Sequence, residues 1–350
     1  MSPNTRIKPF LSFARRMARS RLTGASYPFL VQLNVTNRCN YRCAYCYGHY
    51  FERSKDEMDL PQILSVIDAL AQRGTYRVNF VGGEPLLRED LAEIIRHAKS
   101  RGLVTAMTTN GSLVPKRLDV VRELDSVCFS LDGSAEPNDL GRGKGSFQRV
   151  QEGLKACHSV NVPVQLSAVL TRHTLDQVDF LAALAAEHHC QVGFTPLISQ
   201  DREDKTTSHS LFPDSAALAQ ALDHICHLKR QGAPILFSER AYSYCRDWPA
   251  PGQDVLPAGK PGFTPIPCKA GAFFCLVDYN ANLYPCPQLV GRFKAKNVLQ
   301  DGLDASLAHA AAHGCQACSM PCSNEFSLFF GLSPSVLWEQ LHSRWRSLWA

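Results

Sequence analysis

Between residues 29 and 200, short apolar or alternating segments take turns with longer segments of helical periodicity. Strands are predicted near 31–36, 77–81, 103–108, 126–131, 163–170 and 191–196. Helices are predicted between them at about 61–73, 89–101, 115–123, 146–159 and 175–187. Such alternation is typical of βαβ units that form a parallel sheet. The pattern therefore predicts an α/β fold for this part of the chain.

The two ends of the chain show a different pattern, in which a helical stripe of apolar side chains lies beside basic ones. Residues 1–28 are predicted to form a basic helix that ends at Pro28, with a stripe at Ile7, Phe10, Leu11, Ala14 and Met17. Residues 326–350 are predicted to form a second amphipathic helix, with a stripe at Trp338, Leu341, Trp345 and Leu348. We expect the first helix to cover the edge or bottom of the neighbouring fold. Peripheral contact of the basic ends with a membrane is the alternative.

Residues 201–267 contain one predicted helix near 214–231, followed by a connection rich in Pro and Gly between Trp248 and Pro267. A β-hairpin is predicted next, because an apolar strand at 272–279 runs into a turn at Asn280-Ala-Asn282. Residues 268–325 are therefore predicted to form a small α+β hairpin domain of their own.

Composition limits the class of protein. Of the 350 residues, 45% are hydrophobic and 20% are charged, which is typical of a globular domain. No apolar run approaches the ~20 residues of a membrane span, and we find no signal peptide. Fourteen cysteines without a secretion signal favour metal binding in a reducing compartment, so a cytoplasmic protein is expected. The net charge of +5 is concentrated in the first 23 residues, and nucleic-acid binding is not expected.

Cys39, Cys43 and Cys46 form a C-x3-C-x2-C group directly after the first predicted strand, with the aromatic Tyr45 before the last cysteine. Thiolates select iron–sulfur clusters or zinc. Three thiolates can hold three corners of a [4Fe–4S] cluster and leave one iron open for another ligand. A partial zinc site or buried structural thiols are the alternatives.

Polar residues also follow the next strands. Gly82-Gly83-Glu84 ends the second one; the glycines let a backbone approach a ligand closely, and Glu84 can accept a hydrogen bond from an ammonium. Further candidates follow the next two strands at Asn110, Ser130 and Arg142. Active sites of parallel α/β barrels lie at the carboxyl ends of the strands, which is where these segments and the cysteines fall.

The ordered set of motifs resembles the radical S-adenosylmethionine (SAM) superfamily. This resemblance implies a partial (βα)6 TIM-like barrel and a [4Fe–4S] cluster whose open iron binds the amino and carboxylate groups of SAM. It also implies that the Gly82-Gly83-Glu84 segment faces the amino group, that Ser130 and Asn110 contact the ribose, and that Arg142 contacts the carboxylate. The implied reaction is reductive cleavage of SAM to methionine and a 5′-deoxyadenosyl radical, which abstracts hydrogen from a substrate. A flavodoxin- or ferredoxin-type protein would supply the electron.

The C-terminal cysteines resemble the SPASM and twitch extensions of these enzymes, which carry auxiliary [4Fe–4S] clusters. The resemblance implies one auxiliary cluster on Cys268, Cys286, Cys315 and Cys318. Cys322 is a possible substitute ligand, Cys275 is expected to be buried in the hairpin, and zinc is the alternative metal. The set is shorter than a full SPASM pattern. Pro287 stands where sulfatase-maturing relatives have a catalytic Asp, so that activity is not expected.

The expected function is therefore a radical modification such as oxidation, epimerisation or crosslinking, in a biosynthetic or peptide-maturation pathway. An enzyme that acts on a sugar, nucleotide or lipid-linked small molecule is the second hypothesis. A non-catalytic iron–sulfur or zinc protein is the third, and it would not need Glu84, Ser130 and Arg142 beside the cysteines.

Overall fold

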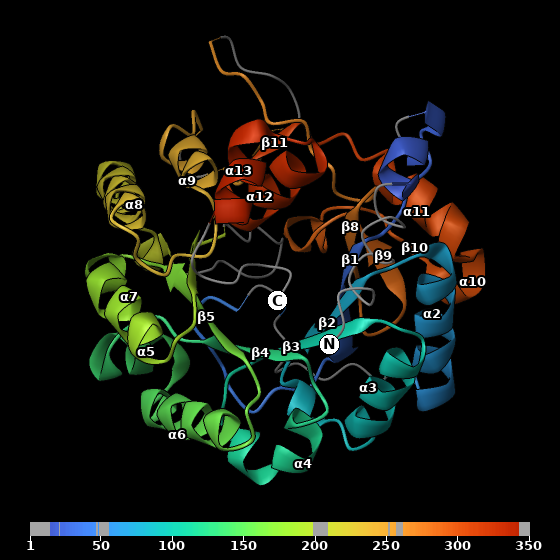
Figure 1. The fold of residues 1–350 in the computed structure, drawn as a ribbon, viewed down its shortest axis with the longest axis horizontal. Helices are drawn as coiled ribbons and strands as arrows, with labels where there is room; N and C mark the ends of the chain where they lie inside the picture. The colour runs from blue at the N-terminus through green and yellow to red at the C-terminus, as the bar shows by residue number, and fades with distance from the viewer. Residues whose placement is uncertain are drawn as a thin grey trace.

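Six parallel strands stand side by side in chain order at the centre of the fold, inside a layer of helices (Figure 1). The computed structural model describes residues 15–20, 22–46, 48, 56–198, 209–250, 253–256 and 262–342. The strands are β1 (Leu30–Thr36), β2 (Arg77–Gly82), β3 (Val104–Thr109), β4 (Ser126–Ser130), β5 (Val164–Leu170) and β6 (Val192–Pro196). Each pairs in parallel with the next, so the predicted partial barrel is confirmed.

The helices that connect these strands are α2 (Leu60–Arg73), α3 (Leu91–Ser100), α4 (Leu118–Val121), α5 (Ala135–Arg142), α6 (Ser146–Ser159) and α7 (Val178–Glu187). Short 3₁₀ helices lie at Pro85–Leu87, Val114–Lys116, Leu175–Gln177, His209–Leu211 and Pro287–Leu289. Alternate residues of β1, among them Leu33 and Val35, are completely buried in the main core. The sequence also sets helix ends: Asp59 and Gln62 form a capping box at the start of α2, and Gly74, at a φ of +100°, ends it.

The C-terminal hairpin extends the barrel sheet instead of forming a sheet of its own. β8 (Phe274–Val277) pairs in parallel with β1, and β9 (Asn282–Tyr284) and β10 (Lys296–Asn297) follow in antiparallel order. The strand order of the sheet is β10-β9-β8-β1-β2-β3-β4-β5-β6. The sequence did not predict this arrangement, because which strand pairs with the free edge of β1 depends on backbone contacts between segments about 240 residues apart.

The remaining elements are α8 (Ser215–Arg230), α9 (Glu239–Arg246), β7 (Val255–Leu256), α10 (Val298–Asp301), α11 (Leu303–Ala311), β11 (Ala317–Cys318), α12 (Pro321–Phe330) and α13 (Pro334–His342). The connection that sequence described as irregular contains β7, which pairs antiparallel with β11. α12 packs against α9 and β6, and it runs across the boundary that we predicted at residue 325. The C-terminal elements are thus closely joined to the barrel.

Residues 15–20 and 22–23 are helical. Met17 is buried in an aromatic cluster with Phe29, Phe274 and Phe330, and the Arg16 guanidinium donates to the Gly74 carbonyl. The chain turns at Gly24, four residues before the predicted end. The other stripe residues, Ile7, Phe10, Leu11 and Ala14, lie outside the described residues. So do Trp345, Leu348 and the side chain of Leu341. Within the described part of the chain, no helix has the length and apolar character needed to cross a membrane.

Candidate active site

The first three cysteines lie in the loop after β1, half-buried at the carboxyl end of the sheet. Burial raises the pKa of the Cys39 thiol to about 12 and also raises that of Cys43, and the neighbouring thiols of the group add to both effects. In the described residues, no three His, Cys, Asp or Glu side chains gather closely enough for a single metal ion. A [4Fe–4S] cluster places each thiolate on a different iron, so its sulfurs stand farther apart. Three thiols on one loop fit such a cluster with one iron open.

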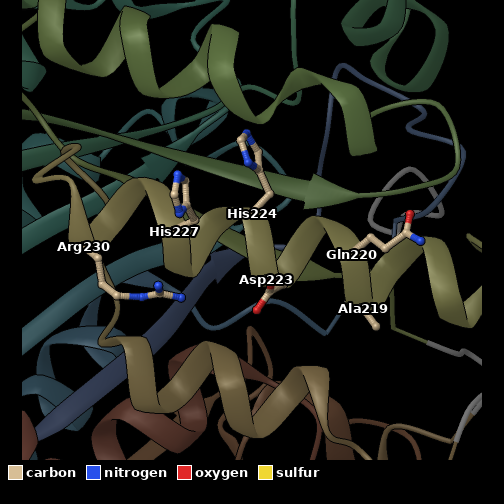
Figure 2. Close-up of a pocket in the computed structure, with 6 residues that line it drawn as sticks. All are labelled: Ala219, Gln220, Asp223, His224, His227 and Arg230. Carbon is tan, nitrogen blue, oxygen red and sulfur yellow. The ribbon is translucent and has the colours of Figure 1, made fainter.

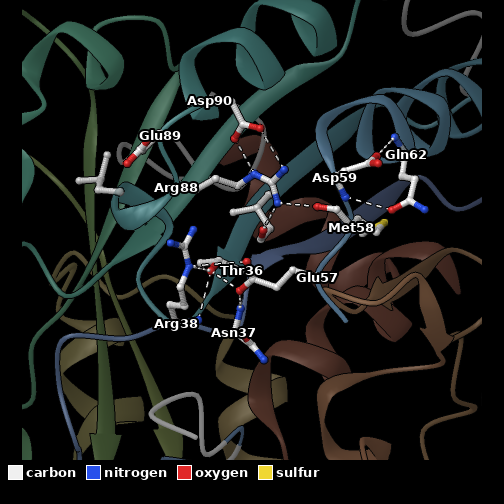
Figure 3. Close-up of polar contacts among 12 residues, drawn as sticks. Thr36, Asn37, Arg38, Glu57, Met58, Asp59, Gln62, Arg88, Glu89 and Asp90 are labelled. Carbon is white, nitrogen blue, oxygen red and sulfur yellow. Dashed lines mark hydrogen bonds and ion pairs between the residues drawn. The ribbon is translucent and has the colours of Figure 1, made fainter. Parts of the chain in front are cut away.

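Glu57 anchors the start of this loop (Figure 3). Its Oε1 accepts hydrogen bonds from the Thr36 hydroxyl at 2.6 Å and the Asn37 amide at 2.7 Å. Its Oε2 lies 3.6 Å from Arg38 Nε. One carboxylate therefore fixes the three residues that precede Cys39.

Arg88 also supports the end of β1, just before the cysteine loop (Figure 3). Its side chain is buried, and its Nη1 donates to the Val35 carbonyl at 2.8 Å and the Met58 carbonyl at 2.9 Å. The Asp90 carboxylate forms a bidentate ion pair with the Arg88 guanidinium, at 2.6 and 3.1 Å. This arginine joins the end of β1 to the residues that lead into α2.

The two glycines of the Gly82-Gly83-Glu84 segment lie directly against the backbone of the cysteine loop. The Gly83 amide donates to the Thr36 carbonyl, and the Glu84 amide donates to the Arg38 carbonyl at 2.8 Å. A Cβ on Gly83 would stand 2.0 Å from the Arg38 oxygen, and one on Gly82 would stand 2.3 Å from the Thr36 oxygen. The close approach that requires glycine here is an approach to the chain itself.

The Glu84 carboxylate is completely buried and bonded to the chain. It accepts hydrogen bonds from the Leu86 amide, from the Thr109 hydroxyl with both oxygens, and from the Asn110 amide at 2.9 Å. Burial raises its pKa to about 7, although these donors oppose the shift. The sequence led us to expect an ammonium as its partner. In the structure the carboxylate connects the end of β2 to the end of β3, and its contact with an ammonium stays a prediction.

Asn110 also holds the cysteine loop. Its Oδ1 accepts hydrogen bonds from the amide and hydroxyl of Ser112, and its Nδ2 donates to Asn40 Oδ1 at 2.9 Å. The side-chain Nδ2 of Asn40 donates in turn to the Ser112 hydroxyl at 2.8 Å. Because Asn40 lies between the first two cysteines, the turn after β3 fixes the middle of the loop.

Ser130, the last residue of β4, is half-buried. Its hydroxyl makes no hydrogen bond within the described residues.

Arg142 closes the site from the end of α5. Its Nε and Nη2 bind both oxygens of Asp132, at 2.6 and 2.8 Å, and all but a tenth of the arginine is buried. Its guanidinium lies 5.5 Å from the centre of the Tyr45 ring, and the Tyr45 hydroxyl donates to Asp132. Sequence reasoning missed Asp132, although its position two residues after β4 could have indicated it. It lies in the same Ser-Leu-Asp segment as Ser130.

The structure brings together the four cysteines that sequence assigned to one auxiliary group. The four are Cys268, Cys286, Cys315 and Cys318, and the Cys268 thiol raises the pKa of each of the other three, in addition to the larger effect of burial. Cys275 points into the main core, away from this group. The sequence did not identify Asn324, whose Nδ2 donates a hydrogen bond to the Cys318 carbonyl at 3.0 Å.

Cys322 lies on another side of this region. It packs against the main core, and it raises the pKa of the buried thiol of Cys245 on α9. Cys245 in turn accepts a hydrogen bond from Asn324 Nδ2 at 3.5 Å and raises the pKa of Cys318, so it lies beside the group as well.

A depression on the surface of α8 carries two histidines (Figure 2), and both histidines and Asp223 already have polar partners. His224 contacts Asp179 at 2.9 Å, and His227 contacts Gln231 at 2.9 Å. Asp223 likewise pairs with an arginine of α9 at 2.8 Å. Ion pairs of this kind are typical of a solvated helix surface.

Comparison with known proteins agrees with this geometry. Residues 33–185 match the family model of the radical SAM superfamily. The chain is 30% identical over 285 residues to the mycofactocin maturase MftC of Mycolicibacterium smegmatis, covering 80% of this chain and 69% of that protein. It is also 30% identical over 208 residues to the Fe-coproporphyrin III synthase of Methanosarcina barkeri, covering 58% of this chain and 52% of that protein.

Solved structures show the same fold. SuiB of Streptococcus suis superposes with a TM-score of 0.63 at 17% identity, covering 84% of this chain and 69% of that one. The enzyme anSMEcpe with bound AdoMet superposes with a TM-score of 0.62 at 14% identity, covering 90% and 100%. The similarity to the maturase, the matching family model and the cysteine loop at the carboxyl end of β1 lead to one conclusion. This chain belongs to the radical SAM superfamily and is an enzyme of that family.

Proposed function

We propose that this enzyme modifies a peptide by radical chemistry, with SAM bound to a [4Fe–4S] cluster on Cys39, Cys43 and Cys46. The observation that carries the peptide assignment is the 285-residue similarity to mycofactocin maturases. The alignment covers 80% of this chain, about 280 of its 350 residues, and only 267 residues precede Cys268. The similarity therefore reaches into the C-terminal cysteine region as well.

When bound, the reduced cluster supplies one electron to the SAM sulfonium, whose cleavage gives methionine and the 5′-deoxyadenosyl radical. The chain provides a rigid frame for this chemistry. Glu57, Arg88 and Asn110 hold the cysteine loop from three sides. The Ser130 hydroxyl is available for the ribose. We propose that Glu84 supports the site indirectly, because its carboxylate holds the ends of β2 and β3 together.

We further propose that Cys268, Cys286, Cys315 and Cys318 hold one auxiliary [4Fe–4S] cluster. The Cys268 thiol raises the pKa of the other three thiols, and this supports the ligand set over one that includes Cys322. An auxiliary cluster could accept an electron from a substrate radical, which suits oxidation or crosslinking. The cluster thiolates require a reducing compartment, in agreement with a cytoplasmic enzyme served by a flavodoxin- or ferredoxin-type donor.

Anaerobic reconstitution tests the assignment. We expect about eight irons per chain and reductive cleavage of SAM to 5′-deoxyadenosine. Changing Cys39, Cys43 and Cys46 together to Ala should remove about half the iron and all deoxyadenosine. A matched triple Ala variant of three core cysteines, Cys157, Cys190 and Cys226, controls for loss of thiols. Deoxyadenosine formation by the first variant would refute the site.

A second candidate is modification of a small molecule. The similarity to Fe-coproporphyrin III synthase and, over 155 residues, to a probable GTP 3′,8-cyclase favours it. Incubation with precursor peptides encoded beside the gene separates the two. A peptide whose mass or stereochemistry changes, together with one deoxyadenosine per event, supports the peptide assignment. Unchanged peptides and a changed small metabolite would refute it.

A further inference from the structure

We propose that Asp132 is a positioning residue of the SAM site, which holds Arg142 and Tyr45 against the cysteine loop. The inference rests on the proposed site at Cys39, Cys43 and Cys46, and it adds a residue with a defined role to that site.

The contacts of Asp132 join three separate segments. Its carboxylate binds Arg142 of α5 through both oxygens, the Tyr45 hydroxyl of the cysteine loop, and the Val169 amide of β5 at 2.9 Å. Its own amide donates to Asn138 Oδ1 at 3.0 Å, which fixes the residue at the end of β4. Asp132 is 1% exposed, so no water replaces these bonds.

The packing around this ion pair leaves little freedom. The Ala44 amide donates to the Gly141 carbonyl, which ties the cysteine loop to α5. A Cβ on Gly141 would stand 2.8 Å from the Tyr45 ring. The loop, the ring and the helix thus meet at one point, and Asp132 is the acceptor that they share.

The ion pair also determines the charge beside the cysteines. The Arg142 guanidinium lies 5.5 Å from the centre of the Tyr45 ring, and Tyr45 stands between Cys43 and Cys46 in the cysteine loop. Two of the three guanidinium nitrogens are bound to Asp132. Within the described residues Nη1 donates no hydrogen bond, so it is the atom available to the SAM carboxylate. With Asp132 in place, the buried cation is neutralised and its free end has a fixed direction.

The test uses the reconstituted enzyme and three variants. Asp132→Asn keeps the shape of the side chain and removes its charge. Tyr45→Phe removes only one of the bonds to Asp132 and is the milder change if Asp132→Asn folds poorly. Asp125→Asn is the matched control, because Asp125 lies at the other end of β4 and binds the amide and hydroxyl of Thr105. Iron content, the SAM dissociation constant and the reduction potential of the cluster without SAM are measured for each.

We expect full iron content in all three variants. Without Asp132, Arg142 should lose its fixed direction and with it the charge-assisted contact to the SAM carboxylate. This loss should raise the SAM dissociation constant of Asp132→Asn by about 10- to 100-fold. Its reduction potential should become more positive, because an unpaired cation then lies beside the cluster. Tyr45→Phe should weaken SAM binding less and leave the potential nearly unchanged, and Asp125→Asn should change neither.

Unchanged SAM affinity and potential in Asp132→Asn would overturn the inference while wild-type cleavage of SAM still supports the proposed function. Equal changes in Asp125→Asn would also overturn it, because they would show a general loss of stability. If the wild type itself takes up iron and does not cleave SAM, the proposed function fails and the inference fails with it.

Discussion

Glu84→Gln in the apoprotein should change how stability depends on pH. Burial raises the pKa of Glu84 from an ordinary 4.5 to about 7. A carboxyl whose folded-state pKa is raised contributes stability that is fully present below pH 4.5 and is lost as the pH rises through 7. At about 1.36 kcal/mol per pKa unit, the shift corresponds to about 3 kcal/mol. Glutamine cannot ionise and lacks this dependence.

The assay is urea unfolding of both proteins at several pH values between 4.5 and 8. The free energy of unfolding of the wild type minus that of the variant should fall by about 3 kcal/mol across this range and then stay constant. Glu325, another buried carboxyl with a raised pKa, is present in both proteins and cancels in the difference. The thiol of Cys39 ionises only near pH 12 and does not contribute.

Glu93→Gln on the exposed face of α3 is the control, since it makes the same chemical change without burial. A difference between wild type and Glu84→Gln that does not vary with pH would refute the argument. It would mean that the hydrogen bonds from Thr109, Leu86 and Asn110 stabilise the charged form enough to offset the loss of solvation.

Three further outcomes are expected. Gly83→Ala should displace the cysteine loop, because the new Cβ would stand 2.0 Å from the Arg38 carbonyl oxygen. Iron uptake should therefore fall sharply, and normal uptake would show that the loop can move aside. Arg88→Ala leaves two buried carbonyls and a carboxylate without their donor, so the free energy of unfolding should fall by about 3–5 kcal/mol in urea titrations. Cys275→Ala should keep the full iron content whereas Cys268→Ala should lose the auxiliary half; equal losses on iron analysis would contradict the proposed ligand set.

The barrel could be predicted from sequence because each of its strands carries a local signal. Alternating apolar residues set the strands, and their order follows from the βαβ connections. The observed bounds of β2 and β6 differ from the predicted ones by a single residue. α5 and α9 were missed, since both are short helices of eight residues that are mostly polar.

The partners of the site residues could not be predicted. A sequence motif shows that a carboxylate or a guanidinium stands near a strand end, but not which group it binds. Glu84 and Arg142 both bind groups of this chain, Thr109 and Asp132, which are 25 and 10 residues away. Likewise, nothing local in residues 274–277 indicates that they lie beside β1.

Because β8 pairs with β1, the barrel depends on the C-terminal part of the chain to complete its sheet. β1 is bonded on one side to β2 and on the other to β8, with Leu30 opposite Phe274 and Leu33 opposite Val277. A fragment that stops at residue 267 would leave the backbone amides and carbonyls along that side of β1 without partners. An uncovered strand of this kind recruits strands from other molecules. Expression of the barrel alone should therefore yield aggregates, and proteases should not release the C-terminal part as a separately folded piece.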